Sequence, residues 1–323
     1  MTAEIVGWLR DHSINLKTIQ SEEDLSDLAP LKGIVGKSQV VGLGEATHGN
    51  KDFALIRDRI ARFLIERMNF NGVIMEVPQE EAKVVDHYIQ TGEGSQEDVF
   101  NGLVYWVFRT QEVLDLINWM RQFNLMSPKR MISFRGCDIP VEDERRNSDQ
   151  SRDKAMAQNV LTFLEEKGPN SKFILWAHNS HIAKSENHSN STDWKTMGSH
   201  LKDHLGDKYI SFAALFNEGS FNARRLSSNQ EAGPLEVFTV QKAEPGHFEN
   251  IFSKTELPLA IFDLRPTRLN PLFQSWFKNQ YKIREVGSVF SNECESDFSY
   301  SINLANKHDV VIWIDKVTPS RLI

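Results

Sequence analysis

Short apolar runs alternate with longer helical patterns along most of this 323-residue chain, and this alternation limits the fold more than any other feature. The runs that predict strands cover residues 38–43, 73–77, 131–138, 172–177, 209–216, 259–264 and 310–314. The stretches that predict helices cover residues 52–70, 80–90, 97–124, 152–167 and 196–205. Brief Val, Ile and Leu runs are typical of parallel strands that are buried on both faces. The pattern therefore predicts an α/β fold with three α/β/α layers around a mostly parallel central sheet.

The remaining segments are assigned around this sheet. Helical spacing over 3–9 and 22–31, with Ser21 before an acidic first turn, predicts an N-terminal helical cover within residues 1–36. The segment 97–130 is rich in Trp and Leu, and we expect its helices to border a cleft at the carboxyl ends of the strands. We expect exposed loops over 141–152 and 184–195, and less regular structure over 219–257. Because no repeat competes with this interpretation, residues 1–323 are predicted to form a single domain.

The charge and the cysteine content exclude several classes of partner. With 37 basic and 44 acidic residues, the net charge of −7 supplies no field that attracts a phosphate backbone or anionic lipid. We therefore expect no nucleic-acid partner and no membrane partner. The cysteines, Cys137 and Cys294, are too few for a disulfide framework, and the N-terminus lacks the pattern of a signal peptide. A cytoplasmic location is the expectation.

Ionisable side chains stand at the ends of four consecutive predicted strands. These residues are Glu45 and His48 after the first strand, Glu76 in the second, Asp138 in the third, and His178 and His181 after the fourth. The carboxyl ends of parallel strands meet at one edge of a sheet, so these side chains are expected to converge there. Glu76 interrupts an otherwise apolar strand, where a charge is costly unless it is paired. The sequence therefore predicts one polar site at this edge.

Several familiar motifs are missing or incomplete. The sequence contains no Gly-x-Ser-x-Gly motif, which disfavours a serine hydrolase of the usual α/β type. Residues 33–38 resemble a phosphate loop, but the strand follows them instead of preceding them. Neither cysteine lies at zinc-ligand spacing. A cluster of carboxylates and imidazoles with no nucleophilic side chain suits the activation of water, because a histidine can take its proton while a carboxylate fixes the tautomer.

The order of motifs along the chain resembles that of the erythromycin esterase family. The matching residues are Gly44-Glu45-Ala46-Thr47-His48-Gly49, Ile74-Met75-Glu76, Trp106 with Glu112, Trp119-Met120-Arg121, Arg135-Gly136-Cys137-Asp138, Arg152 to Asn159, Trp176-Ala177-His178-Asn179-Ser180-His181, Asp309 to Ile314 and Thr318-Pro319. The Glu-x-x-His and His-x-x-His motifs are short, but their occurrence together and in this order is specific. The resemblance covers nearly the whole chain.

This resemblance implies an α/β/α sandwich with a deep cleft, and hydrolysis of an ester or lactone by histidine-activated water without a cofactor. It implies that His48 is the general base and Glu45 its partner, with Glu76, His178 and His181 as the remaining catalytic wall. Arg57 and Asp138 are assigned to substrate binding. The span between the first and last motifs is shorter than in macrolide-hydrolysing members. The predicted partner is thus a small-molecule ester or lactone, and the family's chemistry does not by itself identify it.

Two other functions are compatible with the same residues. In a metal-dependent hydrolase, Glu45, His48, Glu76, His178 and His181 would hold zinc or manganese through histidine and carboxylate ligands. In a non-catalytic binder, the cleft would hold a small molecule without cleaving it. The sequence leaves both alternatives open.

Overall fold

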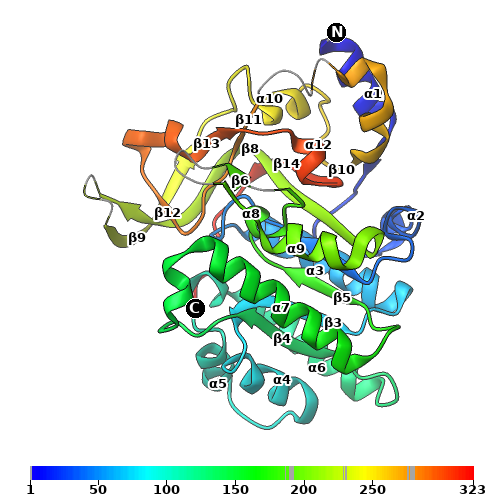
Figure 1. Cartoon of the computed structure of the whole chain (residues 1–323), viewed down its shortest axis with the longest axis vertical. Helices are drawn as coiled ribbons and strands as arrows, with labels where there is room; N and C mark the ends of the chain where they lie inside the picture. The colour runs from blue at the N-terminus through cyan, green and yellow to red at the C-terminus, as the bar shows by residue number, and fades with distance from the viewer. Residues whose placement is uncertain are drawn as a thin grey trace.

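Within the part of the chain that the structure describes, ten strands form one sheet at the centre of the protein (Figure 1). The computed structural model describes residues 2–323 except 186, 189–192, 228, 230, 275 and 277–280. Across the sheet the order is β1 (Ser13–Asn15), β10 (Leu259–Asp263), β14 (Val310–Val317), β8 (Tyr209–Leu226), β2 (Val40–Leu43), β5 (Phe173–Trp176), β3 (Gly72–Pro78) and β4 (Ser133–Asp138), while β9 (Ala232–Val240) and β12 (Val289–Phe290) pair with β8. The pairs β1–β10, β10–β14 and β8–β9 are antiparallel, and the other pairs are parallel. The predicted α/β class with a mostly parallel sheet is confirmed.

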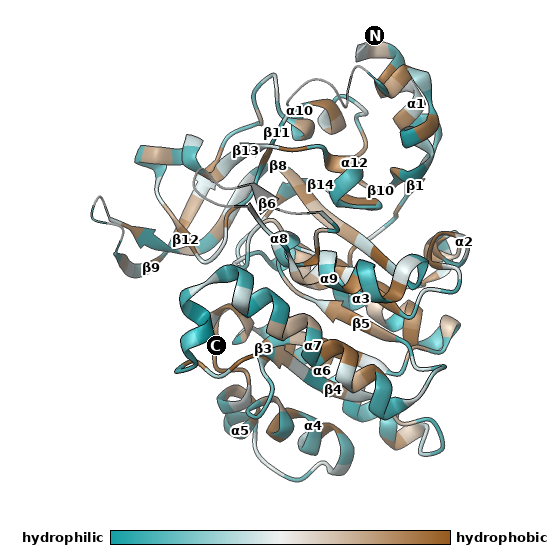
Figure 2. Cartoon of the chain, viewed as in Figure 1, coloured by the Kyte–Doolittle hydropathy of each residue, from teal (hydrophilic) through white to brown (hydrophobic). Residues whose placement is uncertain are grey.

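Helices cover both faces of this sheet. One face packs against α3 (Lys51–Met68), α4 (Ala82–Thr91), α5 (Gln96–Gly102) and α6 (Gln111–Met126). The other face packs against α7 (Asp149–Lys167) and α9 (Met197–Leu205) on one side, and against α1 (Thr2–Asp11), α10 (Phe248–Ser253) and α12 (Leu304–Lys307) on the other. Figure 2 shows hydrophobic residues along the central strands, such as β5, between these layers. The layers agree with the three-layer architecture predicted from the alternation of strands and helices.

Shorter elements connect these layers. The helices among them are α2 (Leu31–Val35) and α8 (Asn179–Ile182), with 3-10 turns η1 (Ser26–Leu28), η2 (Trp106–Phe108), η3 (Glu144–Asn147), η4 (Gly206–Lys208), η5 (Arg265–Leu269), η6 (Pro271–Phe273) and η7 (Asn292–Phe298). The remaining strands form two antiparallel pairs, β6 (Asn187–His188) with β7 (Asp193–Trp194), and β11 (Lys282–Arg284) with β13 (Ser299–Ser301). The predicted loop over 184–195 therefore contains a short strand pair, and part of it lies outside the described residues.

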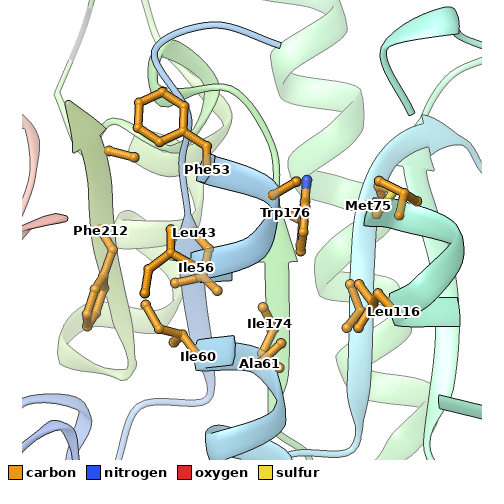
Figure 3. Packing of buried hydrophobic residues seen from close by; sticks show 14 of the residues in the cluster. Leu43, Phe53, Ile56, Ile60, Ala61, Met75, Leu116, Ile174, Trp176 and Phe212 are labelled. Carbon is orange, nitrogen blue, oxygen red and sulfur yellow. The ribbon is translucent and has the colours of Figure 1, made fainter. Parts of the chain in front are cut away.

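The largest hydrophobic cluster fixes α3 against the middle of the sheet. Side chains alternate between the two faces along each strand, so Leu43 of β2 faces this cluster while Val40 faces the cluster under α7. Figure 3 shows Ile56 and Ile60 of α3 beside Leu43, with Phe212 of β8 in the same layer. These side chains are fully buried. The packing holds the start of α3 close to the end of β2, where two predicted site residues lie.

The N-terminal part of the chain differs from the prediction. Residues 21–25 are not helical, and η1 and α2 replace the single helix expected over 22–31. Ser21 bonds the Asp58 carboxyl of α3 instead of capping a helix. Asp27 accepts a hydrogen bond of 2.6 Å from Arg59, whose side chain is fully buried. Because a buried guanidinium requires an acceptor, these contacts with α3 override the local helical pattern.

The prediction for residues 209–257 is wrong in part. β8 does not end at 216 but continues to Leu226, and β9 pairs with this extension. The extension contains polar residues such as Asn217 and Ser220, so it lacks the apolar pattern that predicts a buried strand. From Gly219 onward the extension pairs with β9, and at Arg224 and Arg225 it also pairs with β12; both strands come from later in the chain. Phe221 packs on Phe238 across the β8–β9 pair, with 6.5 Å between ring centroids.

The hydropathy of the helices and the burial of Cys137 bear on two further properties of the protein. Among the described residues, no helix combines the length and hydropathy that crossing a bilayer requires. Cys137 is buried in β4, and burial raises the pKa of its thiol well above the usual value. Cys137 therefore has the character of a small hydrophobic residue rather than a reactive thiolate.

His308 predicts a measurable loss of stability in acid. It is fully buried, its Nδ1 forms a hydrogen bond with the Ser211 hydroxyl at 2.8 Å, and burial lowers its pKa to about 3. The unfolded chain takes up a proton near pH 6.5 that the folded chain binds only near pH 3, so folding stability falls as the pH drops through this window. Replacing His308 by Asn removes this proton uptake. Between about pH 6 and pH 4, the free energy of unfolding of the variant should therefore fall less steeply than that of the wild type, by about 1.4 kcal/mol per pH unit.

Denaturant titrations at several pH values measure this slope for the wild type and the variant. The matched control is His204→Asn, because His204 is exposed on α9. Equal slopes for wild type and His308→Asn would show that His308 does not remain neutral in the folded protein.

Candidate functional site

The loop between β2 and α3 carries Glu45 and His48, and two glycines fix its path. A Cβ atom at Gly44 would lie 2.1 Å from the side-chain oxygen of Asn179, and one at Gly49 would lie 1.9 Å from the carbonyl oxygen of Asn222. Only glycine permits such close approaches. The Asn50 side chain then accepts a hydrogen bond of 2.9 Å from the Phe53 amide and starts α3. This loop is therefore held between the segment after β5 and β8.

Glu45 connects His48 to a buried arginine. His48 Nδ1 donates to Glu45 Oε1 at 2.8 Å, and Arg57 of α3 donates to Glu45 Oε2. The Arg57 guanidinium lies 3.9 Å above the centre of the Trp176 ring, and burial lowers its pKa to about 10 although Glu45 opposes this. Arg57 remains a cation at neutral pH and lies against the side chain of Glu45. Because Glu45 binds Nδ1–H, the tautomer of neutral His48 has its lone pair on Nε2.

A second group of charges surrounds Glu76 at the end of β3. Glu76 Oε1 accepts from Arg152 at 3.0 Å and lies 3.3 Å from His181 Nε2. Asp153 accepts from His181 Nδ1 at 2.6 Å and from the Trp194 indole at 3.0 Å. Burial disfavours the charged form of His181, but Asp153 and Glu76 hold its pKa well above the usual value. His181 is therefore an imidazolium between two carboxylates at neutral pH.

Glu76 also fixes the loop that carries the two later histidines. Its Oε2 accepts from the backbone N–H of His178 at 2.9 Å, which joins the end of β3 to the end of β5. Burial opposes the charge on Glu76, yet His181 and Arg152 hold its pKa well below the usual value. The anionic form is the one that binds all three donors, so this carboxylate organises the edge of the sheet.

His178 has the opposite electrostatic character. Its Nδ1 accepts from the Ser180 backbone N–H at 3.3 Å and caps α8. Burial and, second, the ring of His48, 5.0 Å away between centroids, lower the pKa of His178 to about 3. His178 is neutral over the physiological range. A neutral imidazole beside His48 avoids a second positive charge next to the proposed base.

Asp138 anchors two arginines at the end of β4. Arg152 donates to both of its oxygens, at 3.1 and 2.9 Å, and Arg146 donates at 2.5 Å. Tyr105 donates to the same carboxylate at 3.1 Å. Asp138 itself is fully buried, whereas Arg146 and Arg152 keep 19% and 17% of their side-chain surface exposed. The exposed parts of the two guanidinium groups are the parts that a bound molecule can reach.

These groups surround a cavity of about 200 Å³ at the carboxyl ends of the strands. Its walls are formed by His48, Glu76, Tyr105, Trp106, Val107, Phe108, Arg146, Arg152 and Ser288. A larger cavity of about 590 Å³ lies at the opposite edge of the sheet, beside Gln39, Pro169 and Lys208 at the amino ends of β2, β5 and β8. The larger cavity contains none of the clustered charges described above. In open α/β sheets ligands bind outside the carboxyl ends of the strands, so the smaller cavity is the candidate site.

The structure brings together all six residues that the strand ends predicted. They come from β2, β5, β3 and β4, which are neighbours in the sheet in that order. The two residues predicted to bind substrate lie outside the wall of this cavity. Arg57 lies behind Glu45, and Asp138 lies behind Arg146 and Arg152; neither lines the cavity. Arg57 contacts Glu45, and Asp138 contacts Arg146 and Arg152.

Sequence reasoning missed several residues of the site. The stretch 141–152 was expected to be an exposed loop, but its Arg146 and Arg152 turn inward to Asp138. The predicted strand ends carry several carboxylates, and each buried carboxylate needs a cationic partner. This requirement could have predicted that nearby arginines turn inward. Ser288 comes from the segment before β12, whose Val286 amide donates to the carbonyl of Ala46 at 2.6 Å. No local pattern marks that segment.

The C-terminal residues also support the site. Ser320 donates its amide to the carbonyl of Gly49 at 3.0 Å, next to His48. Arg321 donates to Glu112 at 2.7 Å at the start of α6, just after the η2 residues that line the cavity. This short segment therefore ties the His48 loop to the opposite wall of the cavity.

The charged groups bear on the metal-binding alternative. Across the described residues, no three His, Cys, Asp or Glu side chains are arranged to hold a metal ion. Glu45 is bound by Arg57, and Glu76 is bound by Arg152. Both carboxylates therefore already have cationic partners from the chain itself.

The fold and the site define an α/β protein with a cluster of histidines and carboxylates at the carboxyl edge of a parallel sheet. A model of the erythromycin esterase family matches residues 65–147 and 141–317, and the chain belongs to that family. Over 133 residues it is 31% identical to erythromycin esterase type II of Escherichia coli, a match that covers 41% of this chain and 31% of that protein. The chain matches about a third of the length of such curated relatives.

Solved structures extend the similarity of fold to the whole chain. A Bacillus cereus protein is 24% identical with a TM-score of 0.86, and the match covers 100% of this chain and 99% of that one. A mutant of the erythromycin esterase EreC in its open conformation is 15% identical with a TM-score of 0.71, covering 94% of this chain and 97% of that one. These likenesses confirm the fold predicted from the resemblance.

Proposed function

We propose that this protein hydrolyses a carboxylic ester or lactone with water activated by His48. The observation that carries the proposal is the 2.8 Å contact between His48 Nδ1 and the buried Glu45 carboxylate, in a histidine that lines the cavity. Membership of the erythromycin esterase family supports hydrolysis as the reaction. A positioned imidazole base of this kind contributes about 10²–10⁴-fold to a reaction rate.

The proposed reaction begins with proton transfer to His48. His48 Nε2 takes a proton from water as the water oxygen bonds to the acyl carbon, and Glu45 stabilises the imidazolium that forms. In this proposal the carbonyl oxygen becomes an oxyanion, which Arg146 and Arg152 of the cavity wall stabilise. The C–O ester bond then breaks, and His48 returns the proton to the leaving alkoxide. The products are an acid and an alcohol, or one hydroxy acid from a lactone.

Glu76, His178 and His181 have supporting roles in this proposal. His181 and Arg152 compensate the charge of Glu76, and Glu76 fixes the backbone of His178. His178 stays neutral beside His48, so the proton released by water goes to His48. In this proposal His48 is the base and Glu45 is its partner. Glu76, His178 and His181 determine the electrostatic environment around them.

Replacing Glu45 by Gln tests the proposal. The amide keeps the shape of the side chain but removes the charge that stabilises protonated His48, so we expect kcat to lose a large part of the about 10²–10⁴-fold contribution of the base. Acid release from a panel of small esters and lactones, followed at constant pH, measures turnover. Exposed Glu80 supplies the control, Glu80→Gln. Equal turnover of wild type and Glu45→Gln on a cleaved ester would refute the assignment.

A further inference from the structure

The size of the cavity restricts what can react beside His48. Its volume of about 200 Å³ is below the range of about 300–1,000 Å³ that is typical of sites for drug-sized ligands. At about 30 Å³ for each water molecule in the liquid, it holds about seven waters. A substrate whose ester group reacts inside this cavity can therefore carry an acyl group of only a few non-hydrogen atoms.

One wall of the cavity is aromatic and is fixed on several sides. Tyr105 donates to Asp138, and Arg146 donates to the Tyr105 hydroxyl. Phe108 presents its ring to His48 in a T-shaped contact, with 6.3 Å between centroids. Trp106 lies between these two residues and is half-buried. Because the neighbours of Trp106 are bound to the site itself, this wall limits the size of the group that it contacts and favours an apolar one.

The charges around the cavity are paired. Each of four cations is in contact with a carboxylate, and the pairs are Arg57 with Glu45, Arg152 with Glu76, Arg146 with Asp138, and His181 with Asp153. A bound molecule with its own net charge would have to compete with one of these pairs for a counter-charge. Burying a charge without a partner is costly, so this arrangement favours an uncharged substrate.

We infer that the substrate is a small, uncharged ester or lactone with an apolar acyl group, and that the wall at Trp106 excludes large rings such as macrolides. This inference rests on the proposed hydrolysis and adds the substrate class. In the same reaction, the water oxygen bonds to the acyl carbon, the ester C–O bond breaks, and His48 carries the proton to the leaving alkoxide. The substrate class follows from the volume, the aromatic wall and the paired charges.

The first experiment compares substrates on the wild-type protein. The panel contains δ-valerolactone and phenyl acetate as small neutral probes, phenyl hexanoate and erythromycin as larger ones, and phenyl hydrogen succinate as an anionic one. One methylene in a pocket changes specificity by about 10–200-fold, so kcat/KM for phenyl acetate should exceed that for phenyl hexanoate by at least about tenfold. The succinate ester should be a poorer substrate than phenyl acetate.

The second experiment changes the wall. Trp106→Ala enlarges the cavity and is expected to raise kcat/KM for phenyl hexanoate relative to phenyl acetate at least about tenfold. Ser288→Leu fills the cavity from the other side and should lower turnover of both esters, phenyl hexanoate the more. Leu125→Ala is the control, because Leu125 is 62% exposed on α6 and does not line the cavity. Trp106→Leu repeats the enlargement with a smaller change if the alanine variant does not fold.

The outcomes separate this inference from the proposed function. If wild type cleaves none of these compounds, the hydrolase proposal is wrong and the substrate class falls with it. If its kcat/KM for erythromycin or phenyl hexanoate equals that for phenyl acetate, hydrolysis stands and the inferred substrate class is wrong. The same conclusion follows if Trp106→Ala leaves the size preference unchanged. A preference for small neutral esters that relaxes in Trp106→Ala supports both.

Discussion

Replacing His48 by alanine is expected to lower kcat for ester hydrolysis by about 10²–10⁴-fold, the contribution of a positioned general base. The reason is geometric. His48 lines the cavity, keeps 12% of its side-chain surface exposed, and has its tautomer set by the 2.8 Å contact with Glu45. Alanine leaves water in the cavity without a base, while Arg146 and Arg152 of the cavity wall remain.

Acid release at constant pH measures this effect on whichever ester of the panel the wild type cleaves. His87→Ala is the matched control, because the His87 side chain is 56% exposed on α4 and does not line the cavity. A kcat of His48→Ala within about twofold of the wild type would remove His48 from the mechanism, because a lost base costs far more than that.

Replacing Arg152 by methionine is expected to lower the free energy of unfolding by about 3–5 kcal/mol. Methionine keeps the length of the side chain but removes the charge that Glu76 and Asp138 share. Although burial opposes its charge, these carboxylates hold the pKa of Arg152 above its usual value, so the guanidinium is always charged. Its loss leaves two buried carboxylates with fewer donors, which is the costly way to break a buried ion pair.

Denaturant-induced unfolding measures the effect, and the slope of the transition shows whether the folded state stays compact. Arg145→Met is the matched control on the same segment. Arg145 pairs with Asp143 and is 54% exposed, so its replacement should leave the free energy of unfolding essentially unchanged. Equal stability of Arg152→Met and Arg145→Met would show that Arg152 does not carry the charge balance of the site.

The sequence predicted the part of the fold that depends on local pattern. Strands β2, β3, β4 and β5 are short, and each has an ionisable residue within two positions of its carboxyl end. Both the sheet and the clustering of Glu45, Glu76 and His178 could therefore be expected. The helix α3 follows its apolar periodicity, with Asn50 and Asn69 as its two caps. Such features are encoded within a few residues of one another.

The parts that sequence reasoning missed depend on contacts between distant segments. Arg59 of α3 binds Asp27 of η1 where one helix was predicted over 22–31, and the extension of β8 forms because β9 supplies its partners. Arg152 belongs to a charged stretch whose sequence is typical of a solvated loop. Its inward position depends on Asp138, which comes from β4. Tertiary pairing of charges and strands overrides local propensity in these cases.

Chemical rescue of His48→Ala by free imidazole tests the central claim most directly. If His48 activates water, the cavity left by alanine accepts imidazole, and turnover should rise with imidazole concentration, saturate, and follow its neutral form as the pH changes. Adding imidazole to the His87→Ala control should change nothing. Turnover by His48→Ala that is low and does not respond to imidazole, although imidazole binds the variant, would contradict the claim that His48 is the base.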